Sequence, residues 1–249
     1  MEPRKIAGDA RKELMDGSGA VTEENDDNEK VTLAGHIKDK LVEKKERDVA
    51  EQRHITGQHA DPRQQRLPPG QHLVEKWPVL DLGVTPNVPK DAFTLDVAGE
   101  IENSVSWSWS DLMAQPQATM TSDIHCVTSW SRFDNHWQGV SAAHLLSVVK
   151  PKPAASHVLF VSHDNYTTNI PFSHFTGDDV ILAHSWEGKP LDREHGGPLR
   201  IILPKLYLWK SAKWVKRIVF MARDMQGYWE VRGYHNIGDP WEEERYSER

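Results

Sequence analysis

The cysteine at position 126 is the residue best suited to chemistry, because it is the single thiol among the 249 residues. It stands beside His125, at the end of a strand-like stretch, and six residues before Arg132. Nearby cations lower the pKa of a thiol and make its sulfur a nucleophile or a soft metal ligand. From spacing alone, a lone cysteine is more often a small buried apolar residue. A Cys/His hydrolase is another interpretation, but neighbouring side chains on a strand point to opposite faces, so its base would be a histidine other than His125.

A second group of reactive residue types lies near the C-terminal third of the chain. His195 and two glycines precede Arg200, and Lys210, Ser211, Ala212 and Lys213 follow ten residues later. Glycines allow a ligand to approach the backbone closely. Lysines supply point charges, arginine supplies a planar fork, and backbone amides add directed donors, so the group has the chemistry of a phosphate site. A surface loop with solvated lysines between packing tryptophans is the alternative, and local chemistry does not decide between them.

Several common metal and nucleotide motifs are absent. The thirteen histidines are scattered without a HExxH motif, so each is more often a surface or core residue than a zinc ligand. Neither GxxxxGK[ST] nor GxGxxG occurs. One cysteine also excludes an intramolecular disulfide, a Cys-rich zinc module and a Cys₄ iron–sulfur site.

Charge divides the chain into two regions. Residues 1–66 carry 28 charged side chains and no aromatic residue, whereas all ten tryptophans follow. A segment of this composition buries too little apolar surface to offset the entropy of ordering. We therefore expect a charged, disordered extension over residues 1–66 and one domain over residues 67–249, separated by the Pro-Pro-Gly at 68–70. Residues 31–52 have helical apolar spacing, which favours a solvated helix or disorder over a partner-binding helix.

The second region shows the pattern of a mixed α and β domain. Strands are predicted at residues 93–99, 118–125, 157–161, 166–170, 199–203 and 214–222. Ser110 is expected to cap a short helix that ends by Pro116, and residues 141–149 form a second helix that Pro151 terminates. Strands with short helices and no regular βαβ alternation predict the α+β class. These elements would place Cys126 at a strand end and Arg200 within a strand.

The overall charge limits the classes of partner. A net charge of −7 leaves no basic footprint for nucleic acid, and no apolar run is long enough to span a membrane. The N-terminus shows neither an apolar signal region nor a twin arginine, so we expect a cytoplasmic protein.

Taken together, the two reactive groups resemble a known family. Four motifs recur there in the same order: Cys126, Val127 and Trp130; Trp137 and Gly139; Gly197 to Arg200; and Lys210 to Lys213. From about residue 67 to residue 246, the chain resembles the single-domain bacterial sulfite-oxidase-like oxidoreductases, or oxidoreductase molybdopterin-binding domains, of the sulfite oxidase superfamily. These are related to the catalytic subunit of the periplasmic protein-methionine-sulfoxide reductase. Residues 233–241 strengthen the match.

The resemblance implies an enzyme that uses a molybdenum–molybdopterin cofactor on the sulfite-oxidase-type α+β fold, with mixed β-sheets and short helices. Cys126 would be the protein's ligand to molybdenum, since a deprotonated sulfur suits a metal that two dithiolene sulfurs already hold. The implied reaction is a two-electron transfer of an oxygen atom to or from a small S-oxide, oxyanion or similar substrate. The protein would orient and tune the cofactor.

The resemblance also implies contacts to the pterin and its phosphate. The matching positions are Ser162, His195, Arg200, Ser211, Ala212 and Lys213. Ser162 stands where the reductase relatives have threonine, and His195 stands where they have asparagine. Lys210 matches only as a neighbour of these positions. Contacts upstream of the first predicted strand, around residues 71–77, are not assigned.

The departures from the family are equally informative. Residues 127–130 replace the arginine-rich motif of true sulfite oxidases, so sulfite is not the implied substrate, and Arg132 is the one nearby cation for an oxyanion. No cytochrome b5 domain is recognised, which implies an external haem, flavin or quinone protein as electron partner. Two alternatives stay open at this point: a molybdopterin-binding domain without turnover, and a Cys126-dependent hydrolase.

Overall fold

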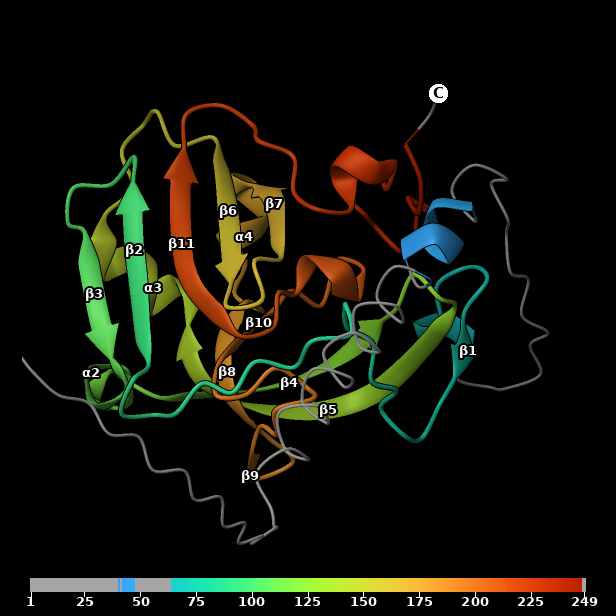
Figure 1. Cartoon of the computed structure of the whole chain (residues 1–249), viewed down its shortest axis with the longest axis horizontal. Coiled ribbons are helices and arrows are strands. Elements are labelled where there is room, and N and C mark those ends of the chain that lie inside the picture. The colour runs from blue at the N-terminus through green and yellow to red at the C-terminus, as the bar shows by residue number, and fades with distance from the viewer. Residues whose placement is uncertain (1–39, 41, 48–63, 248–249) are drawn as a thin grey trace, which may run out of the picture.

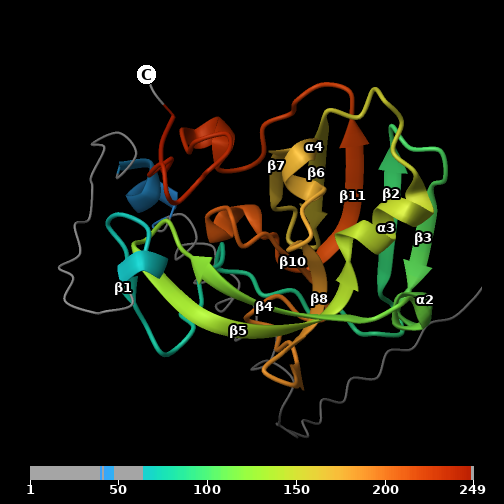
Figure 2. The same ribbon diagram turned by 180° about the vertical axis from the view of Figure 1, so that it is seen from behind.

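Two mixed β-sheets form the body of the molecule, as seen from opposite sides in Figures 1 and 2. The computed structural model describes residues 40, 42–47 and 64–247. Within them, helices are few and short, so the expected α+β class is confirmed. Among the same residues, no helix is long and apolar enough to cross a membrane.

The first sheet has the order β3-β2-β11-β6-β7 in the described chain. Its strands are β2 (Thr94–Gly99), β3 (Val105–Ser108), β6 (His157–Ser162), β7 (Thr167–Pro171) and β11 (Val215–Met221). The central strand β11 runs parallel to β2 and antiparallel to β6. The helices α3 (Ala142–Val149) and α4 (Phe172–Phe175) lie on the face turned to the viewer in Figure 2. Their apolar side chains join the larger hydrophobic cluster with the inner residues of this sheet.

The second sheet carries the cysteine. Its strands in the described residues are β1 (His72–Leu73), β4 (Ala118–His125), β5 (Trp130–Ser141), β8 (Ile181–Trp186), β9 (Lys189–Pro190) and β10 (Arg200–Ile202). The long strand β5 pairs with β4, β8 and β1. Cys126 lies in the turn between β4 and β5, and the amide N–H of Cys126 donates to the carbonyl oxygen of Trp130 at 2.8 Å. Two adjoining strands thus hold the thiol in a closed hairpin turn.

Local capping explains the helix boundaries. Helix α3 begins after Ser141, whose hydroxyl accepts the N–H of His144, and it ends at Lys150 before Pro151, as predicted. The N-cap predicted at Ser110 is wrong. Helix α2 (Trp109–Ala114) is capped by Ser108, which forms a reciprocal capping box with Asp111. This reciprocal pair satisfies two N–H groups, which Ser110 inside the first turn cannot do.

The six predicted strands are all present, and no end is shifted by more than one residue. The short strands β1, β3 and β9 and the longer strands β5 and β8 were not predicted. In β5, polar Arg132, Asp134 and His136 alternate with buried Phe133 and Asn135, so the apolar signal is diluted. Of residues 31–52, the structure describes only 40 and 42–47, which are helical, and the rest of that prediction lies outside the described residues. The division at residue 66 likewise stays a prediction.

Candidate functional site

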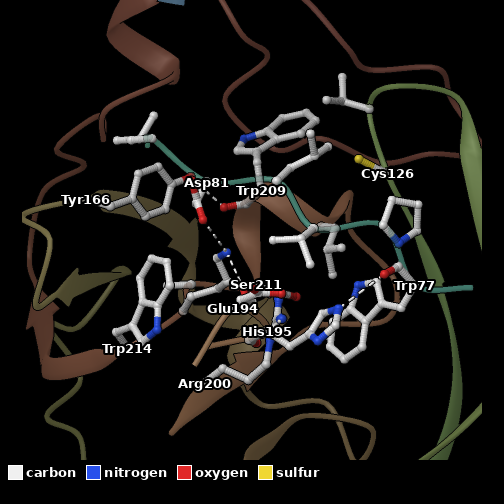
Figure 3. A pocket seen from close by; sticks show the side chains of 18 of the residues that line it. Trp77, Asp81, Cys126, Tyr166, Glu194, His195, Arg200, Trp209, Ser211 and Trp214 are labelled. Atoms are coloured by element: carbon white, nitrogen blue, oxygen red, sulfur yellow. Dashed lines mark hydrogen bonds and ion pairs between the residues drawn. The ribbon is translucent and has the colours of Figure 1, made fainter. Parts of the chain in front are cut away.

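A pocket lies between turns that come from both sheets, as Figure 3 shows. It contains about 770 Å³ of empty space, its open mouth included. The aromatic residues of its lining are Trp77, Trp130, Tyr166, Trp209, Trp214 and Trp229. The charged residues are Lys45, Asp81, Asp164, Glu194, Arg200 and Lys213. Cys126, His195, Ser211 and Ala212 also line it, so folding brings the two reactive groups of the sequence into one cavity.

Cys126 is buried at one side of this pocket. Its sulfur lies 3.1 Å from the hydroxyl oxygen of Thr128, and burial raises the pKa of the thiol. The sequence suggested a cation-activated thiol, and the structure corrects this: Lys45 and Arg245 favour the thiolate, but burial outweighs them. The adjacent His125 turns its Nδ1 to the hydroxyl of Ser131, 2.8 Å away, and the contact that the Cys126 sulfur makes is with Thr128.

Arg200 lies across the pocket from Cys126 and is almost fully buried. Its guanidinium donates to the carbonyl oxygens of His195 at 2.6 Å and Ser211 at 3.0 Å. Its Nε has no hydrogen-bond partner. Burial lowers the pKa of this guanidinium, since carbonyl dipoles compensate a buried charge less well than an anion would.

Lys213 extends the same wall, which we call the cationic wall (Arg200 and Lys213). Its Nζ donates to the carbonyl oxygen of Glu194 at 2.7 Å and lies 3.9 Å from the carboxylate of Asp81. Burial, followed by repulsion from Arg200, lowers the pKa of Lys213 to about 8. Two adjacent cations with incomplete compensation fit an anionic ligand, such as a phosphate.

The neighbouring residues of the loop have different roles from those the sequence suggested. Lys210 does not line the pocket, and its Nζ lies 2.6 Å from the carboxylate of Glu230 in a fully buried ion pair. The phosphate site therefore has one lysine of this loop instead of two. The hydroxyl oxygen of Ser211 accepts the N–H of Leu203 at 2.9 Å, so this oxygen is already engaged within the protein. Ala212 is buried and presents only small atoms to the lining.

His195 lies at the pocket wall with both ring nitrogens engaged. Its Nδ1 lies 2.9 Å from the carboxylate of Asp192, and its Nε2 lies 3.2 Å from the carbonyl oxygen of Trp77. The two following glycines serve packing within the protein. A Cβ at Gly196 would lie 2.9 Å from the side chain of Lys213. We predicted that these glycines let a ligand approach the backbone. In the structure the space beside them is filled by other segments of the protein.

Ser162 ends strand β6 behind the pocket surface and is not among the lining residues. Its hydroxyl is fully buried and has no hydrogen-bond partner. The amide N–H of the next residue, His163, donates to the carbonyl oxygen of Trp214, which does line the pocket. An unsatisfied buried hydroxyl costs about 1–3 kcal/mol, so this position gains from a ligand that supplies the missing partner.

Arg132 is not the oxyanion-binding cation that the sequence suggested. Its guanidinium pairs with the carboxylate of Glu187 at 3.3 Å and packs over the ring of Trp186, outside the pocket lining. Cys126 lies in the turn before β5, whereas Arg132 lies on β5 opposite Ile124 of β4. Proximity in sequence therefore did not give proximity in space.

Among the lining or adjoining residues that were missed at the level of sequence are Lys45, Trp77, Asp81 and Arg245. Lys45 and Arg245 lie 81 and 119 residues from Cys126, and no motif marked them. Trp77 falls in the unassigned stretch 71–77, and its ring stacks on His195 with a centroid distance of 4.1 Å. The tryptophan count was the one available signal, because six aromatic residues surround the cavity.

Comparison with known proteins gives a consistent result. The model of the family described as oxidoreductase molybdopterin binding domain matches residues 82–229. The chain is 40% identical to the uncharacterized oxidoreductase YuiH of Bacillus subtilis over 183 residues, which cover 73% of this chain and 92% of that protein. It is 26% identical to the protein-methionine-sulfoxide reductase catalytic subunit MsrP of Campylobacter jejuni, covering 55% of this chain and 51% of that one.

A solved structure shows the same fold. The sulfane dehydrogenase SoxCD of Paracoccus pantotrophus superposes with a TM-score of 0.51 at 22% identity, covering 56% of this chain and 40% of that chain. The expected sulfite-oxidase-type molybdopterin-binding fold is therefore confirmed.

Proposed function

Since the chain belongs to the oxidoreductase molybdopterin-binding domain family, we propose that it transfers one oxygen atom and two electrons to or from a small S-oxide or oxyanion. The enzyme class and the molybdenum–molybdopterin cofactor follow from the family. The observation that carries the proposal is the pocket itself, which has the thiol of Cys126 on one side and Arg200 across from it, with Lys213 also in the lining.

The residues present fit this cofactor. The orphaned Nε of Arg200 and the orphaned hydroxyl of Ser162 are buried polar atoms that need a partner. The cationic wall needs an anion, and the cofactor carries a phosphate. Within residues 40, 42–47 and 64–247, no three His, Cys, Asp or Glu side chains gather where they could hold a metal ion. A metal at Cys126 therefore needs further ligands from a cofactor.

Each residue then has a defined task. When bound, the cofactor supplies a metal that exchanges an oxygen atom with the substrate and changes its oxidation state by two electrons. Cys126 would bind the metal as a thiolate, releasing the proton that burial retains in the free thiol. Arg200, Lys213 and His195 would hold the pterin and phosphate, with Ser211 and Ala212 lining the same side of the pocket. Ser162 lies behind this surface, and its contact with the cofactor stays a prediction. The aromatic lining excludes water and thereby strengthens these electrostatic interactions.

The same geometry disfavours the hydrolase alternative. A cysteine hydrolase needs a thiolate and a base within hydrogen-bond reach. Here the contact of the Cys126 sulfur is the hydroxyl of Thr128, and burial raises the pKa of the thiol. The electron partner is proposed to be a separate redox protein, and a cytoplasmic location stays a prediction.

Replacing Cys126 tests the proposal directly. Wild-type protein from cells that make the cofactor should carry about one molybdenum and one pterin per chain. Cys126→Ser exchanges a soft thiolate for a hard hydroxyl, so molybdenum retention and turnover should fall by more than the about 10–100-fold typical of lost outer-shell partners. Elemental analysis, pterin fluorescence and an S-oxide assay with an artificial electron donor measure these effects. Thr128→Ser, which keeps the neighbouring hydroxyl, is the control.

Two outcomes would contradict the proposal. Full molybdenum and activity in Cys126→Ser would remove Cys126 as the ligand. A loaded wild-type protein whose molybdenum responds to no S-oxide or oxyanion would favour binding without turnover.

A further inference from the structure

The turn that carries the thiol, which we call the Cys126 turn (residues 126–129), is held from outside by two buried side chains. The Nε2 of Gln71 donates to the carbonyl oxygen of Cys126 at 3.1 Å. A guanidinium N–H of Arg245 donates to the carbonyl oxygen of Val127 at 2.6 Å. Gln71 precedes Cys126 by 55 residues, and Arg245 follows Val127 by 118 residues. Segments distant in sequence therefore meet at two successive peptide groups of the turn.

The side-chain amide of Gln71 is engaged at both ends. The residue is fully buried, and its Oε1 accepts from the hydroxyl of Ser131 at 3.3 Å. Because Ser131 donates to Gln71, its own oxygen accepts the Nδ1–H of His125, 2.8 Å away. The directions of these bonds agree, so the network links the residue before Cys126 to the carbonyl oxygen of Cys126. A buried polar network in which donors and acceptors match favours one arrangement of the chain.

Arg245 joins the Cys126 turn to the chain before β1. The residue is 3% exposed, and its other terminal nitrogen donates to the carbonyl oxygen of Pro69 at 3.4 Å. The guanidinium also lies over the ring of Tyr207, 5.1 Å from the centroid. Because a guanidinium is planar and rigid, two carbonyl oxygens bound to it are fixed relative to each other. Removing the side chain would leave the carbonyl oxygen of Val127 without this buried donor.

Gln71 and Arg245 both lie outside residues 82–229, the part of the chain that matches the family model. Within that part, the N–H of Cys126 donates to the carbonyl oxygen of Trp130 at 2.8 Å. The flanking segments, which lie at the same end of the second sheet in Figure 1, bind the carbonyl oxygens. The peptide groups on both sides of Cys126 are therefore fixed, and they determine the φ and ψ that direct its Cα–Cβ bond.

We propose that Gln71 and Arg245, together the turn clamp, are positioning residues that hold the sulfur of Cys126 in place as the metal ligand. The inference rests on the proposed function and adds two residues to it. Neither residue lines the pocket, so each acts through the backbone of the Cys126 turn and not by contact with a ligand. Partners of this kind orient a metal ligand without touching the metal.

Alkylation in the cofactor-free, full-length chain tests the turn clamp without metal. Cys126 is the single thiol and is 5% exposed, so the rate of labelling reports how often this turn opens. Gln71→Met keeps the length of the side chain but removes its donor and acceptor. Iodoacetamide should then react about 10-fold faster or more, since the loss of a buried hydrogen bond favours the open turn.

Arg245→Met should accelerate the reaction by a similar factor. Loss of a nearby cation alone would raise the pKa of the thiol and slow the reaction, so acceleration reports the position of the sulfur and not its charge. Arg245→Lys keeps a donor and the charge, and its rate should stay within about 3-fold of wild type. Leu145→Ala is the control, because it destabilises α3 in the other hydrophobic cluster without touching the Cys126 turn.

The loaded full-length enzyme provides the second readout. Loss of an outer-shell partner costs about 10–100-fold in metal affinity or activity, so kcat for an S-oxide should fall by at least about 10-fold in both Met variants. KM should change less than about 2-fold, because neither residue lines the pocket. The electron paramagnetic resonance signal of the one-electron-reduced metal should broaden, since the sulfur would take several positions. Arg245→Lys should restore kcat and the signal, and Leu145→Ala should leave both unchanged.

The outcomes separate failure of this inference from failure of the proposed function. Unchanged alkylation and an unchanged metal signal in both Met variants would overturn the turn clamp in an otherwise active enzyme. Equal effects of Leu145→Ala would also overturn it, because loss of stability alone would then explain them. A wild-type chain that never loads molybdenum contradicts the proposed function, and its alkylation rates still test the clamp. Gln71→Met, which alters no charge, carries the test if Arg245→Met does not fold.

Discussion

Lys210 and Lys213 lie three residues apart in one loop, yet their positive charges are compensated to very different degrees. The ammonium of Lys210 contacts the carboxylate of Glu230 at 2.6 Å and the carbonyl oxygens of Asn169 and Asn236 at 2.8 and 2.7 Å. The ammonium of Lys213 has a carbonyl partner and a carboxylate only at 3.9 Å. The first charge is compensated inside the protein, and the second is compensated only in part.

The difference shows that a fold can leave a buried charge incompletely compensated where an anionic ligand can supply the missing partner. Burial lowers the pKa of both amines, but Glu230 opposes the effect at Lys210, whereas Arg200 adds to it at Lys213. A compensated buried charge stabilises one arrangement of the chain. An uncompensated one costs stability until an anion arrives. The Lys210 region therefore supports the fold, whereas we propose that the cationic wall receives the phosphate of the cofactor.

The largest expected effect comes from breaking the compensated pair. Lys210→Met leaves Glu230 buried without its cation, and removing one partner of such a pair costs about 3–5 kcal/mol. Urea unfolding of the cofactor-free chain measures this loss in the free energy of unfolding. Adding Glu230→Gln to Lys210→Met should recover much of it, because the amide needs no cation. A loss below 1 kcal/mol would mean that the pairing of Lys210 with Glu230 does not stabilise the fold, and the comparison with Lys213 would fail.

An intermediate effect is expected from neutralising the cationic wall. Arg200→Met together with Lys213→Met removes two charged donors, so affinity for the cofactor should fall by about 10–100-fold or more. Molybdenum and pterin per chain measure the occupancy, and thermal unfolding checks that the chain remains folded. Lys189→Met, an exposed lysine on β9, is the matched control. Unchanged occupancy in the double variant would remove the phosphate assignment.

The smallest effect is a pH-dependent gain in stability. In the cofactor-free chain, the pKa of Lys213 is about 8 instead of 10.5. Below pH 8 both states bind the proton, so the folded chain bears the whole cost of the buried charge. Between pH 8 and 10.5 the unfolded chain binds more protons, so the stability of the folded chain rises with pH. Lys213→Met should therefore be more stable than wild type at pH 7, on the order of 1 kcal/mol after the loss of one hydrogen bond.

Urea unfolding at pH 7 and pH 10 tests this sign, since the advantage of Lys213→Met should shrink at the higher pH. In the cofactor-loaded enzyme the order should reverse, with wild type the more stable. A pH-independent difference would mean that Lys213 carries no buried charge.

The predictions from sequence succeeded where the signal is local. Strand β6 and its hairpin partner β7 follow from apolar runs around a polar turn, and α3 follows from Ser141 and Pro151. Strand β5 was missed because its buried face includes Asn135, which a hydrophobic pattern does not register. The N-cap of α2 was misplaced by two residues, since several serines compete there and only the capping box decides.

Sequence by itself determined that Cys126 is the single thiol and that it follows a strand. It also determined that a strand arginine and a lysine-containing loop occur in the same chain, because the chain carries residue type and local spacing directly. The tertiary structure decided which charges meet. It turned Arg132 to Glu187, paired Lys210 with Glu230, left Lys213 facing the pocket, and brought Lys45 to Cys126 across 81 residues. The compensation of a buried charge depends on partners within a few ångströms, and the packing of distant segments selects those partners.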